Sequence, residues 1–337
     1  MVMPKKSITI SHNLKRLVSI LSDDKYHSGT EIGKELGLTR SGIWKLVKQL
    51  ELLNIEIESV TNKGYKLVTT LDLLDKNKIK KYLQDTSTVI NKILLFDDLP
   101  STNNYLVENA SHFAGENIVC LSEQQTGGRG RLGRKWISPF AANIYLSLLW
   151  NFPFNISELA GLNIVIGVAV AEAIKEAAGM KSVNLKWPND IFYNERKLGG
   201  ILIDIVGEYN GACSAVIGIG INVHMPISSG NDIQKPWTDI FTATGETVSR
   251  NKLVGVLLNK LTTLLPLFEK KGMKGFIKSW NTMDYLSGKK TIVKSGVRSL
   301  KGTAKGINDD GHLILATDDG EMIVITTGDV SIVQAKK

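Results

Sequence analysis

The chain has 337 residues, which fits two domains with room for a third small one. Its composition, with 43% hydrophobic and 22% charged residues, is ordinary for a globular protein and excludes a disordered chain. Cys120 and Cys213 make no disulfide framework, and the five scattered histidines form no zinc-binding pattern. The N-terminus has no apolar signal segment, and no apolar run is long enough to span a membrane. We therefore expect a cytoplasmic protein with no membrane partner.

The charge is concentrated at the two ends of the chain. Residues 1–70 carry 11 Lys and Arg against 7 Asp and Glu, a net charge of +4. Residues 71–270 are balanced at 19 against 19, and residues 271–337 again carry 11 against 7. A basic end segment fits a nucleic acid or an acidic protein partner.

The first 70 residues predict a helix-turn-helix. Ser11 is placed to cap a first helix, and Thr30 to cap a short helix over 31–36. Gly37 then supplies a tight turn, after which Thr39 begins a longer helix. The apolar spacing predicts the inward-facing positions, which are Leu14, Leu17, Val18, Leu21, Ile43, Leu46, Val47 and Leu50.

A hairpin is expected directly after these helices. Residues 55–60 alternate like a strand, residues 61–64 turn, and residues 65–68 return. This hairpin would be the wing of a winged helix-turn-helix, which we place at residues 1–70. The alternative is a small helical bundle whose lysines only solvate its surface. The residues expected to contact DNA are Thr39, Arg40, Ser41, Lys45, Lys48 and Lys63.

The middle of the chain predicts an α+β domain. Residues 71–90 read as a helical linker, and residues 91–284 mix strands and helices. Several strands are joined by short turns, which favours a mixed, largely antiparallel sheet over a doubly wound parallel one. Strands are expected near 92–97, 117–122, 143–150, 183–187, 190–193, 198–206 and 212–223, and helices near 102–110, 157–178 and 250–270.

The tail, residues 285–337, changes in pattern. Short β-rich runs are separated by two Asp-Asp-Gly turns, at 309–311 and 318–320. This arrangement predicts a small SH3-like β-barrel. The expected strands lie at 289–293, 300–307, 313–316 and 322–326.

The densest chemical signal is the segment Gly127 to Trp136, which holds four glycines and four cations. Glycine-rich backbone and arginine side chains are suited to a phosphate or carboxylate ligand. The segment contains G-x-G-x-x-G, but Pro139 and a strand follow it instead of a helix, so a dinucleotide fold is excluded. Arg134 and Lys135 replace the Lys and Ser/Thr of a P-loop. A flexible basic loop or an RNA contact remains the alternative.

Three further segments carry a similar signal. Lys186-Trp187-Pro188-Asn189-Asp190 places a lysine at a strand end, and residues 197–202 combine a lysine with glycines. In residues 218–223, alternating glycines allow a ligand to lie against the strand. Each of these has a plain structural explanation when taken alone, either a good turn or tight sheet packing.

Taken together, the segments resemble those of biotin–protein ligases. The order Ser101-Thr102-Asn103, then 123–136, then 186–190, then 197–202 is that of this family. The winged helix in front makes the chain similar to its bifunctional type, which combines a ligase with a biotin-operon repressor. The resemblance covers the whole chain and implies a central domain like a class II aminoacyl-tRNA synthetase.

The resemblance also implies the chemistry. Such ligases activate biotin with MgATP to biotinyl-5′-AMP and transfer it to a lysine of the biotin carboxyl carrier protein of acetyl-CoA carboxylase. They need no tightly bound cofactor and no protein-bound metal. The biotin-binding residues would be Ser101, Thr102, Asn103, Gln125, Arg129, Gly130, Arg131 and Lys186, with Lys186, Arg131 and Arg129 catalytic. The ATP or adenylate side would be formed by Arg134, Trp136, Asn189, Lys197 and Asn222.

In the repressor type, biotinyl-5′-AMP is also the corepressor. The loaded protein forms a homodimer and binds operator DNA, so the expected partners are the carrier protein, the operator and a second copy. The alternatives are a lipoate–protein ligase, which shares the catalytic fold, and a monofunctional ligase or sensor whose winged helix does not bind DNA. Gly42 lies inside the expected recognition helix, where glycine lowers helix propensity. Because of this departure, the operator sequence is not predicted.

Overall fold

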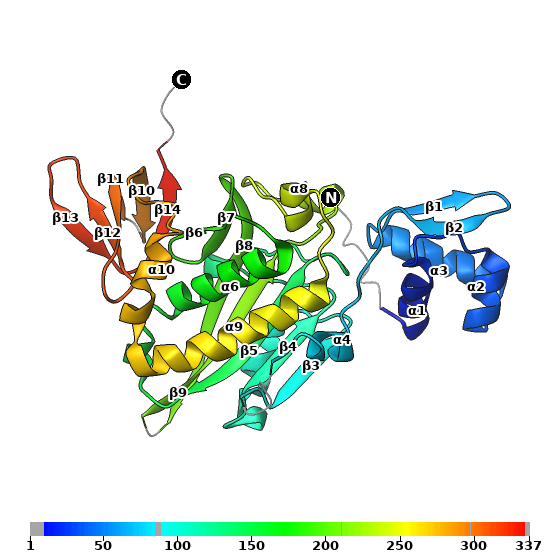
Figure 1. The fold of residues 1–337 in the computed structure, drawn as a ribbon, viewed down its shortest axis with the longest axis horizontal. Coiled ribbons are helices and arrows are strands. Elements are labelled where there is room, and N and C mark those ends of the chain that lie inside the picture. Colours follow the sequence, from blue (N-terminus) through cyan, green and yellow to red (C-terminus); the bar gives the residue numbers. More distant parts are fainter. Residues whose placement is uncertain (1–9, 85–88, 210, 297, 334–337) are drawn as a thin grey trace.

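The computed structural model describes residues 10–84, 89–209, 211–296 and 298–333. Figure 1 shows three units in a row, with the N-terminal helices at one end, a large sheet in the middle and a small sheet at the other end. No helix in these four ranges is long and apolar enough to cross a membrane. The α+β prediction, with a winged helix in front, is confirmed.

The N-terminal unit is a winged helix-turn-helix, as predicted. Its elements are α1 (His12–Leu21), α2 (Gly29–Leu36), α3 (Arg40–Leu52), β1 (Ile57–Val60) and β2 (Gly64–Leu67). The two strands form an antiparallel hairpin. The predicted inward-facing side chains of α1 and α3 are buried in one apolar cluster. The 3.6-residue spacing therefore indicated the correct faces.

The start of α2 was predicted two residues too late. Ser28, not Thr30, caps this helix: its hydroxyl accepts a hydrogen bond from the Glu31 amide at 3.1 Å. The Glu31 carboxylate in turn accepts from the Ser28 amide at 2.9 Å. This reciprocal capping box satisfies two backbone donors at once, which Thr30 alone would not do. Gly37 ends the helix in the left-handed region, with φ of 67°.

The linker is mostly not helical, contrary to expectation. Only α4 (Lys76–Lys80) is an α-helix within the described part of residues 71–90, and residues 85–88 lie outside the description. The preceding stretch, 72–74, uses its backbone groups for contacts with the central unit. Those contacts compete with helical hydrogen bonds and keep the stretch irregular.

The central unit is built on a seven-stranded sheet with the order β3-β4-β5-β9-β8-β7-β6. β3 and β4 pair in parallel, and the other neighbouring pairs are antiparallel. The mixed, largely antiparallel sheet is thus confirmed. Its strands are β3 (Lys92–Phe96), β4 (Ile118–Ser122), β5 (Ile144–Phe152), β6 (Asn184–Lys186), β7 (Asp190–Tyr193), β8 (Arg196–Tyr209) and β9 (Ala212–Ile221).

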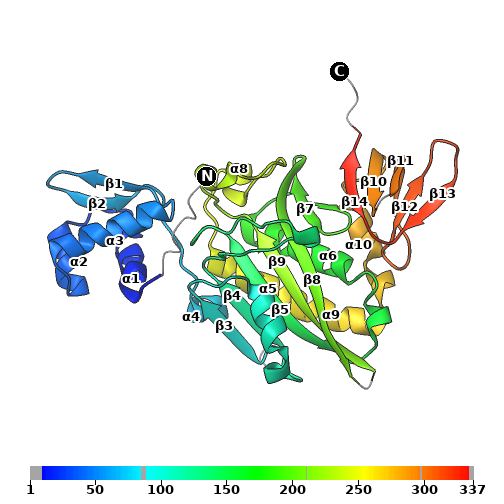
Figure 2. The same cartoon turned by 180° about the vertical axis from the view of Figure 1, so that it is seen from behind.

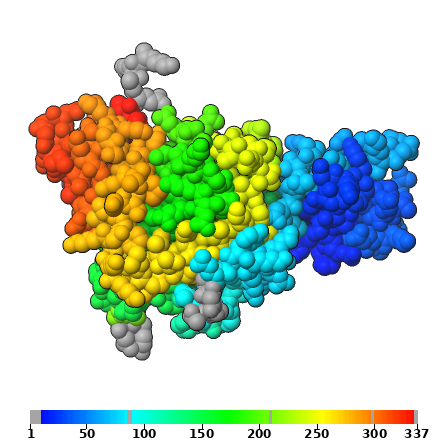
Figure 3. Space-filling model, in the orientation of Figure 1, coloured from blue at the N-terminus to red at the C-terminus, as the bar shows by residue number. Residues whose placement is uncertain are grey.

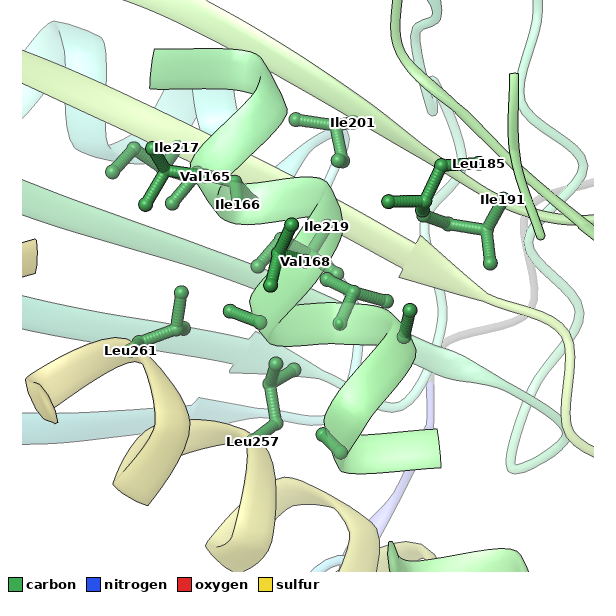
Figure 4. Close-up of a cluster of buried hydrophobic side chains, with 14 of the residues drawn as sticks. Val165, Ile166, Val168, Leu185, Ile191, Ile201, Ile217, Ile219, Leu257 and Leu261 are labelled. Atoms are coloured by element: carbon green, nitrogen blue, oxygen red, sulfur yellow. The ribbon is translucent and has the colours of Figure 1, made fainter. Parts of the chain in front are cut away.

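Two long helices, α6 (Leu162–Ala178) and α9 (Arg250–Lys271), cover one face of this sheet (Figure 1). Figure 4 shows Val165 and Val168 of α6 and Leu257 of α9 in the core between helices and strands. The view from behind in Figure 2 shows α5 (Thr102–Asn109) on the opposite face. Helix α6 begins later than predicted because residues 156–159 form a separate 3₁₀ turn. The short helices α7 (Ile227–Gly230), α8 (Ile240–Thr244) and α10 (Ile277–Asn281) were not predicted.

The C-terminal unit is a five-stranded antiparallel sheet with the order β13-β12-β11-β10-β14. The fifth strand, β14, is an addition to the four predicted. The indole of Trp187 donates a hydrogen bond to the Gly311 carbonyl at 3.0 Å and so joins this unit to the central one. The strands are β10 (Lys290–Ser295), β11 (Arg298–Ile307), β12 (Leu313–Ala316), β13 (Met322–Ile325) and β14 (Asp329–Ile332).

The N-terminal unit also touches the central one, as Figure 3 shows. Phe140 and Ala141, which follow the glycine-rich segment, are buried in the apolar cluster of the winged helix. The Lys15 ammonium lies 2.7 Å from the Asp97 carboxylate, close to the start of α5. The segment that follows the predicted ligand loop is therefore part of the winged-helix core.

A buried ion pair fixes the linker between these units. The side chains of Arg250 and Glu123 are each 3% exposed, and their charged groups lie 2.7 Å apart. Arg250 also donates to the carbonyls of Asp72, at 2.6 and 3.0 Å, and of Asn143, at 3.1 Å. The other Glu123 oxygen accepts from the Leu74 amide at 2.5 Å. Buried charges are tolerated when they are fully paired in this way.

We predict that Arg250→Ala destabilises the fold by about 3–5 kcal/mol, because it leaves the Glu123 carboxylate buried and unpaired. The matched control is Lys260→Ala on the same helix, whose exposed pair with Glu176 should be worth about 1 kcal/mol or less. Urea unfolding measures both. An Arg250→Ala variant as stable as the control would contradict this assignment.

Candidate active site

A cleft of about 520 Å³ opens on the α5 side of the central sheet. It lies between the start of α5, strands β8 and β9, the glycine-rich loop and strand β14 of the C-terminal unit. Residues that are far apart in the sequence therefore meet at one place. The ligand-site residues predicted from the sequence all line this cleft: Ser101, Thr102, Asn103, Gln125, Arg129, Gly130, Arg131, Arg134, Trp136, Lys186, Asn189, Lys197 and Asn222.

One end of the cleft is a buried cluster of neutral polar groups at the start of α5, which Ser101 caps. Gln125 accepts hydrogen bonds from the amide and hydroxyl of Thr102, at 2.9 and 3.1 Å. The hydroxyl of Ser147 lies 2.5 Å from the amide oxygen of Asn103. Buried donors and acceptors in a fixed arrangement suit a small neutral polar ring better than an ion.

The alternating glycines of β9 make room for side chains of the cleft. Because side chains alternate across a strand, Ile219 faces the helical core while Gly218 and Gly220 face the cleft. A Cβ at Gly218 would overlap the amide group of Asn103, and one at Gly220 would lie 2.6 Å from the Trp136 ring. The glycines were expected to let a ligand lie against the strand. The structure shows that Asn103 and Trp136 occupy this space.

The glycine-rich loop folds back on itself over the cleft. The Gly130 amide donates to the Arg134 carbonyl at 2.6 Å, and the Trp136 amide donates to the Gly128 carbonyl at 2.8 Å. Residues 131–133 form a 3₁₀ turn at its tip. The half-buried Arg131 reaches inward and donates to the Asn189 side chain at 3.2 Å. The folded loop thus places three arginines, Arg129, Arg131 and Arg134, in the lining of the cleft.

Three of the cleft cations are paired with carboxylates of the protein itself. Pairing inside the cleft holds each side chain near the position in which an anionic ligand would meet it. The acidic partners were not predicted from the sequence, because each acid lies in a different element of the chain from its cation. The pairs are Arg129 with Asp204 at 3.2 Å, Arg134 with Asp329, and Lys197 with Asp190 at 2.6 Å.

Lys186 is placed differently. It ends β6, and its ammonium lies 5.0 Å from the centre of the Phe192 ring. Burial lowers the pKa of Lys186 below its ordinary value of 10.5, while Asp190 works in the opposite direction. A partly desolvated ammonium is a strong electrostatic partner for a ligand anion. Lys186 is therefore a cleft cation that has no close carboxylate among the described residues and is able to meet an anionic group of a ligand.

The two asparagines on the far side of the cleft are fixed by backbone contacts. The side-chain amide of Asn189 donates to the Ile201 carbonyl at 3.1 Å, and the side-chain amide of Asn222 donates to the Thr238 carbonyl at 3.0 Å. Within the described ranges, no group of three His, Cys, Asp or Glu residues is arranged to hold a metal ion.

Sequence reasoning missed one further segment of the cleft, residues 232–237. Its backbone is held to β8, because the Lys197 amide donates to the Pro236 carbonyl at 3.0 Å. Lys235 brings a further cation, and burial lowers its pKa. The signal was present: Lys235-Pro236-Trp237 has the same residue types as Lys186-Trp187-Pro188.

The residues predicted to meet DNA lie apart from this cleft, on the winged helix. Thr39 caps α3, and its hydroxyl accepts from the Gly42 amide at 3.2 Å. Lys63 lies in the turn of the wing, 5.6 Å from the Tyr26 ring centre. Lys48 also pairs with Glu51 at 2.6 Å. The remaining predicted positions, Arg40, Ser41 and Lys45, are exposed on α3.

Comparison with protein families matches all three units of the chain. The model of the biotin/lipoate A/B protein ligase family matches residues 95–222. An HTH domain model matches residues 13–66, and the biotin protein ligase C-terminal domain matches residues 286–333. The catalytic family alone does not separate biotin from lipoate.

Full-length relatives make that distinction. The bifunctional ligase/repressor BirA of Salmonella typhimurium is 34% identical over 90% of this chain and 92% of its own length. The chain belongs to the biotin protein ligase family, in its bifunctional ligase/repressor form. BirA of Escherichia coli is 32% identical over 96% of this chain and 98% of its own length. BirA of Bacillus subtilis is 32% identical over 91% of this chain and 94% of its own length.

Solved structures agree with this family. The biotin protein ligase of Aquifex aeolicus in complex with biotin and ATP superposes with a TM-score of 0.61 and 26% identity. It covers 73% of this chain and is itself matched over its whole length.

We predict that Gly218→Ala impairs the binding of biotin, the small molecule named in the Aquifex complex, by about tenfold or more. The added methyl group would displace the Asn103 amide, and small displacements in a binding site have large effects. The matched control is Gly207→Ala in the neighbouring strand, where a Cβ would meet nothing within 4 Å. Isothermal titration measures both. Equal affinities for the two variants would place the biotin ring elsewhere.

Proposed function

We propose that this protein is a biotin–protein ligase that also represses transcription in response to biotinyl-5′-AMP. The observation that carries the ligase assignment is the meeting of a neutral polar cluster and a set of cations in one cleft. Biotin has two parts that complement these two regions: a neutral ureido ring for the polar cluster and a carboxylate for the cations. The relatives of nearly equal length, each a bifunctional ligase/repressor, support the second activity.

The reaction has two steps. In the first, a biotin carboxylate oxygen attacks the α-phosphorus of ATP, forming biotinyl-5′-AMP and releasing pyrophosphate. In the second, the amine of a carrier lysine attacks the acyl carbon, AMP leaves, and the lysine loses a proton as the amide forms. We propose that Mg²⁺ enters with ATP as part of the substrate. The proposed acceptor is the biotin carboxyl carrier protein of acetyl-CoA carboxylase, and the proposed compartment is the cytoplasm.

The neutral end of the cleft would bind the ring of biotin. Thr102, Asn103 and Gln125 are buried or half-buried, and their donors and acceptors are held by one another, by Ser147 and Ser138, and by the Asp204 carboxylate, which accepts from Asn103 at 3.0 Å. Such a prearranged cluster selects a neutral ligand of matching hydrogen-bond pattern, because a mismatched ligand would leave buried polar groups unpaired. Ser101 supports the cluster by capping α5.

The charged part of the cleft would carry the chemistry. Bringing a carboxylate to a polyphosphate requires fixed positive charge, and charge also develops in the transition state. We assign this role to Lys186, Arg129 and Arg131, with Arg134 and Lys197 toward the nucleotide. No protein nucleophile is needed, so positioning and electrostatics account for the rate. On the nucleotide side, Asn189 and Asn222 would line the pocket and Trp136 would lie against the adenine.

The loop from Gly127 to Trp136 would close over the adenylate. A mixed anhydride is sensitive to water, so a covering loop preserves it until the carrier arrives. The loop is joined to the winged-helix core through Phe140 and Ala141. For repression, we propose that the loaded protein forms a homodimer that places two winged helices on paired operator half-sites.

We predict that Lys186→Ala lowers adenylate formation by at least a hundredfold, because the reacting carboxylate loses its partner. The measurement uses radiolabelled biotin with MgATP, first without a carrier to trap bound adenylate, then with a biotin carboxyl carrier domain. Lys181→Ala, an exposed lysine before the same strand, is the matched control. Wild-type rates in Lys186→Ala would refute its role, and no label on the carrier with the wild type would refute ligation itself.

We further predict that Arg131→Ala releases biotinyl-5′-AMP faster than the wild type, since its contact to Asn189 across the cleft would be lost. Loss of adenylate from the washed complex is followed over time by filter binding. Leu132→Ala, a residue of the same loop that is 75% exposed and does not line the cleft, serves as the control. Retention that is the same in both variants would argue against a covering role for this loop.

A further inference from the structure

One tryptophan of this chain is exposed on the helix that is expected to bind DNA. The chain has six tryptophans, and all of them lie in described ranges. Trp150, Trp187 and Trp280 are at most 2% exposed. Trp44, on α3, is 53% exposed. A single exposed apolar side chain is ordinary, but an indole between two cations along one helix indicates a surface that a partner covers.

The neighbours of Trp44 identify the charge of that partner. Arg40 and Lys48 lie one helical turn before and after it, so cation, indole and cation form one row along α3. The Lys48 ammonium lies 6.0 Å from the centre of the Trp44 ring. Ser41 and Lys45 are exposed beside this row. The partner therefore carries negative charge and an apolar feature between its charges.

The rest of the helix explains why Trp44 is not simply a displaced core residue. Ile43, Leu46, Val47 and Leu50 fill the inward face of α3 and are buried. Trp44 lies outside this inward face and is not part of the apolar cluster of the winged helix. A second copy of this surface would face it with like charges, which favours an anionic partner over self-association.

Duplex DNA has the required combination. Its major groove admits an α-helix, its phosphates flank the groove, and each thymine places an apolar C5-methyl group on the groove floor. We propose that Trp44 is a specificity-determining residue that contacts a thymine methyl group of the operator, with Arg40 and Lys48 on the flanking phosphates. This inference rests on the proposed repressor function and names a chemical group of the DNA that α3 would recognise.

The test uses full-length protein loaded with biotin and MgATP and a library of duplexes with a randomised segment. Wild type, Trp44→Ala and Leu52→Ala are each taken through selection. Leu52 is the matched control, because it is 68% exposed at the other end of the same helix. We expect wild type and Leu52→Ala to enrich the same sequence, and Trp44→Ala to lose the preference for thymine at a defined position in each half-site. An unchanged circular dichroism spectrum, together with retained binding to random-sequence duplex at low salt, shows that the winged helix of Trp44→Ala is folded.

The removal of one methyl group from the DNA then locates the contact. Replacing that thymine by uracil removes only the C5-methyl group. We expect uracil to weaken wild-type binding several-fold and to leave binding by Trp44→Ala unchanged. Lys48→Ala should instead weaken binding to all sequences alike and reduce its salt dependence.

Acrylamide quenching of tryptophan fluorescence supplies an independent reading. The exposed Trp44 should be quenched in the free protein and protected in the DNA complex, and Trp44→Phe should remove this change. Trp44→Ala selecting the wild-type sequence with wild-type affinity, or Trp44 staying quenchable on DNA, would overturn the proposal. A wild type that enriches no sequence contradicts the repressor function itself, and the inference with it.

Discussion

The ion pair between Arg250 and Glu123 is the interaction on which the other parts of the molecule depend. Glu123 directly follows β4 and leads to the glycine-rich loop, and its carbonyl accepts from the Ala141 amide, where that loop returns, at 3.0 Å. Arg250 begins α9 and holds the carbonyl of Asp72 in the linker. Both ends of the ligand loop, the long core helix and the linker to the winged helix thus meet at two buried charges. Loss of either charge would loosen all of them.

The second constraint is electrostatic. A cleft with several cations would be unfavourable if their charges faced one another without compensation. The protein places Asp204 beside Arg129 and Asp190 beside Lys197, so the side chains are already oriented before an anion binds. Such preorganisation lowers the reorganisation that binding and reaction require. Lys186 has no such close carboxylate pair among the residues described, and burial disfavours its charge, as it does the charges of Arg131 and Lys235.

Much of this could be predicted because the signals are local. The 3.6-residue spacing of α1 and α3 and the loop from Gly127 to Trp136 each depend on neighbouring residues in the chain. The start of α2 was misplaced although the Ser28–Glu31 capping box is a local signal, but other errors came from long-range contacts. The linker 72–74 is irregular because Arg250, far along the sequence, binds its backbone. The pairing of Asp204 and Asp329 with cleft arginines could not be predicted, since an isolated acid in a strand gives no sign of which cation it will meet.

The winged helix and the ligase cleft would use one molecule, biotinyl-5′-AMP, as both intermediate and corepressor. The most direct test is an electrophoretic shift of DNA from upstream of a biotin-synthesis gene, with the wild-type protein. A shift should require biotin and MgATP together, and preformed biotinyl-5′-AMP should replace both. A shift of equal strength with biotin alone, or none with preformed adenylate, would contradict the account.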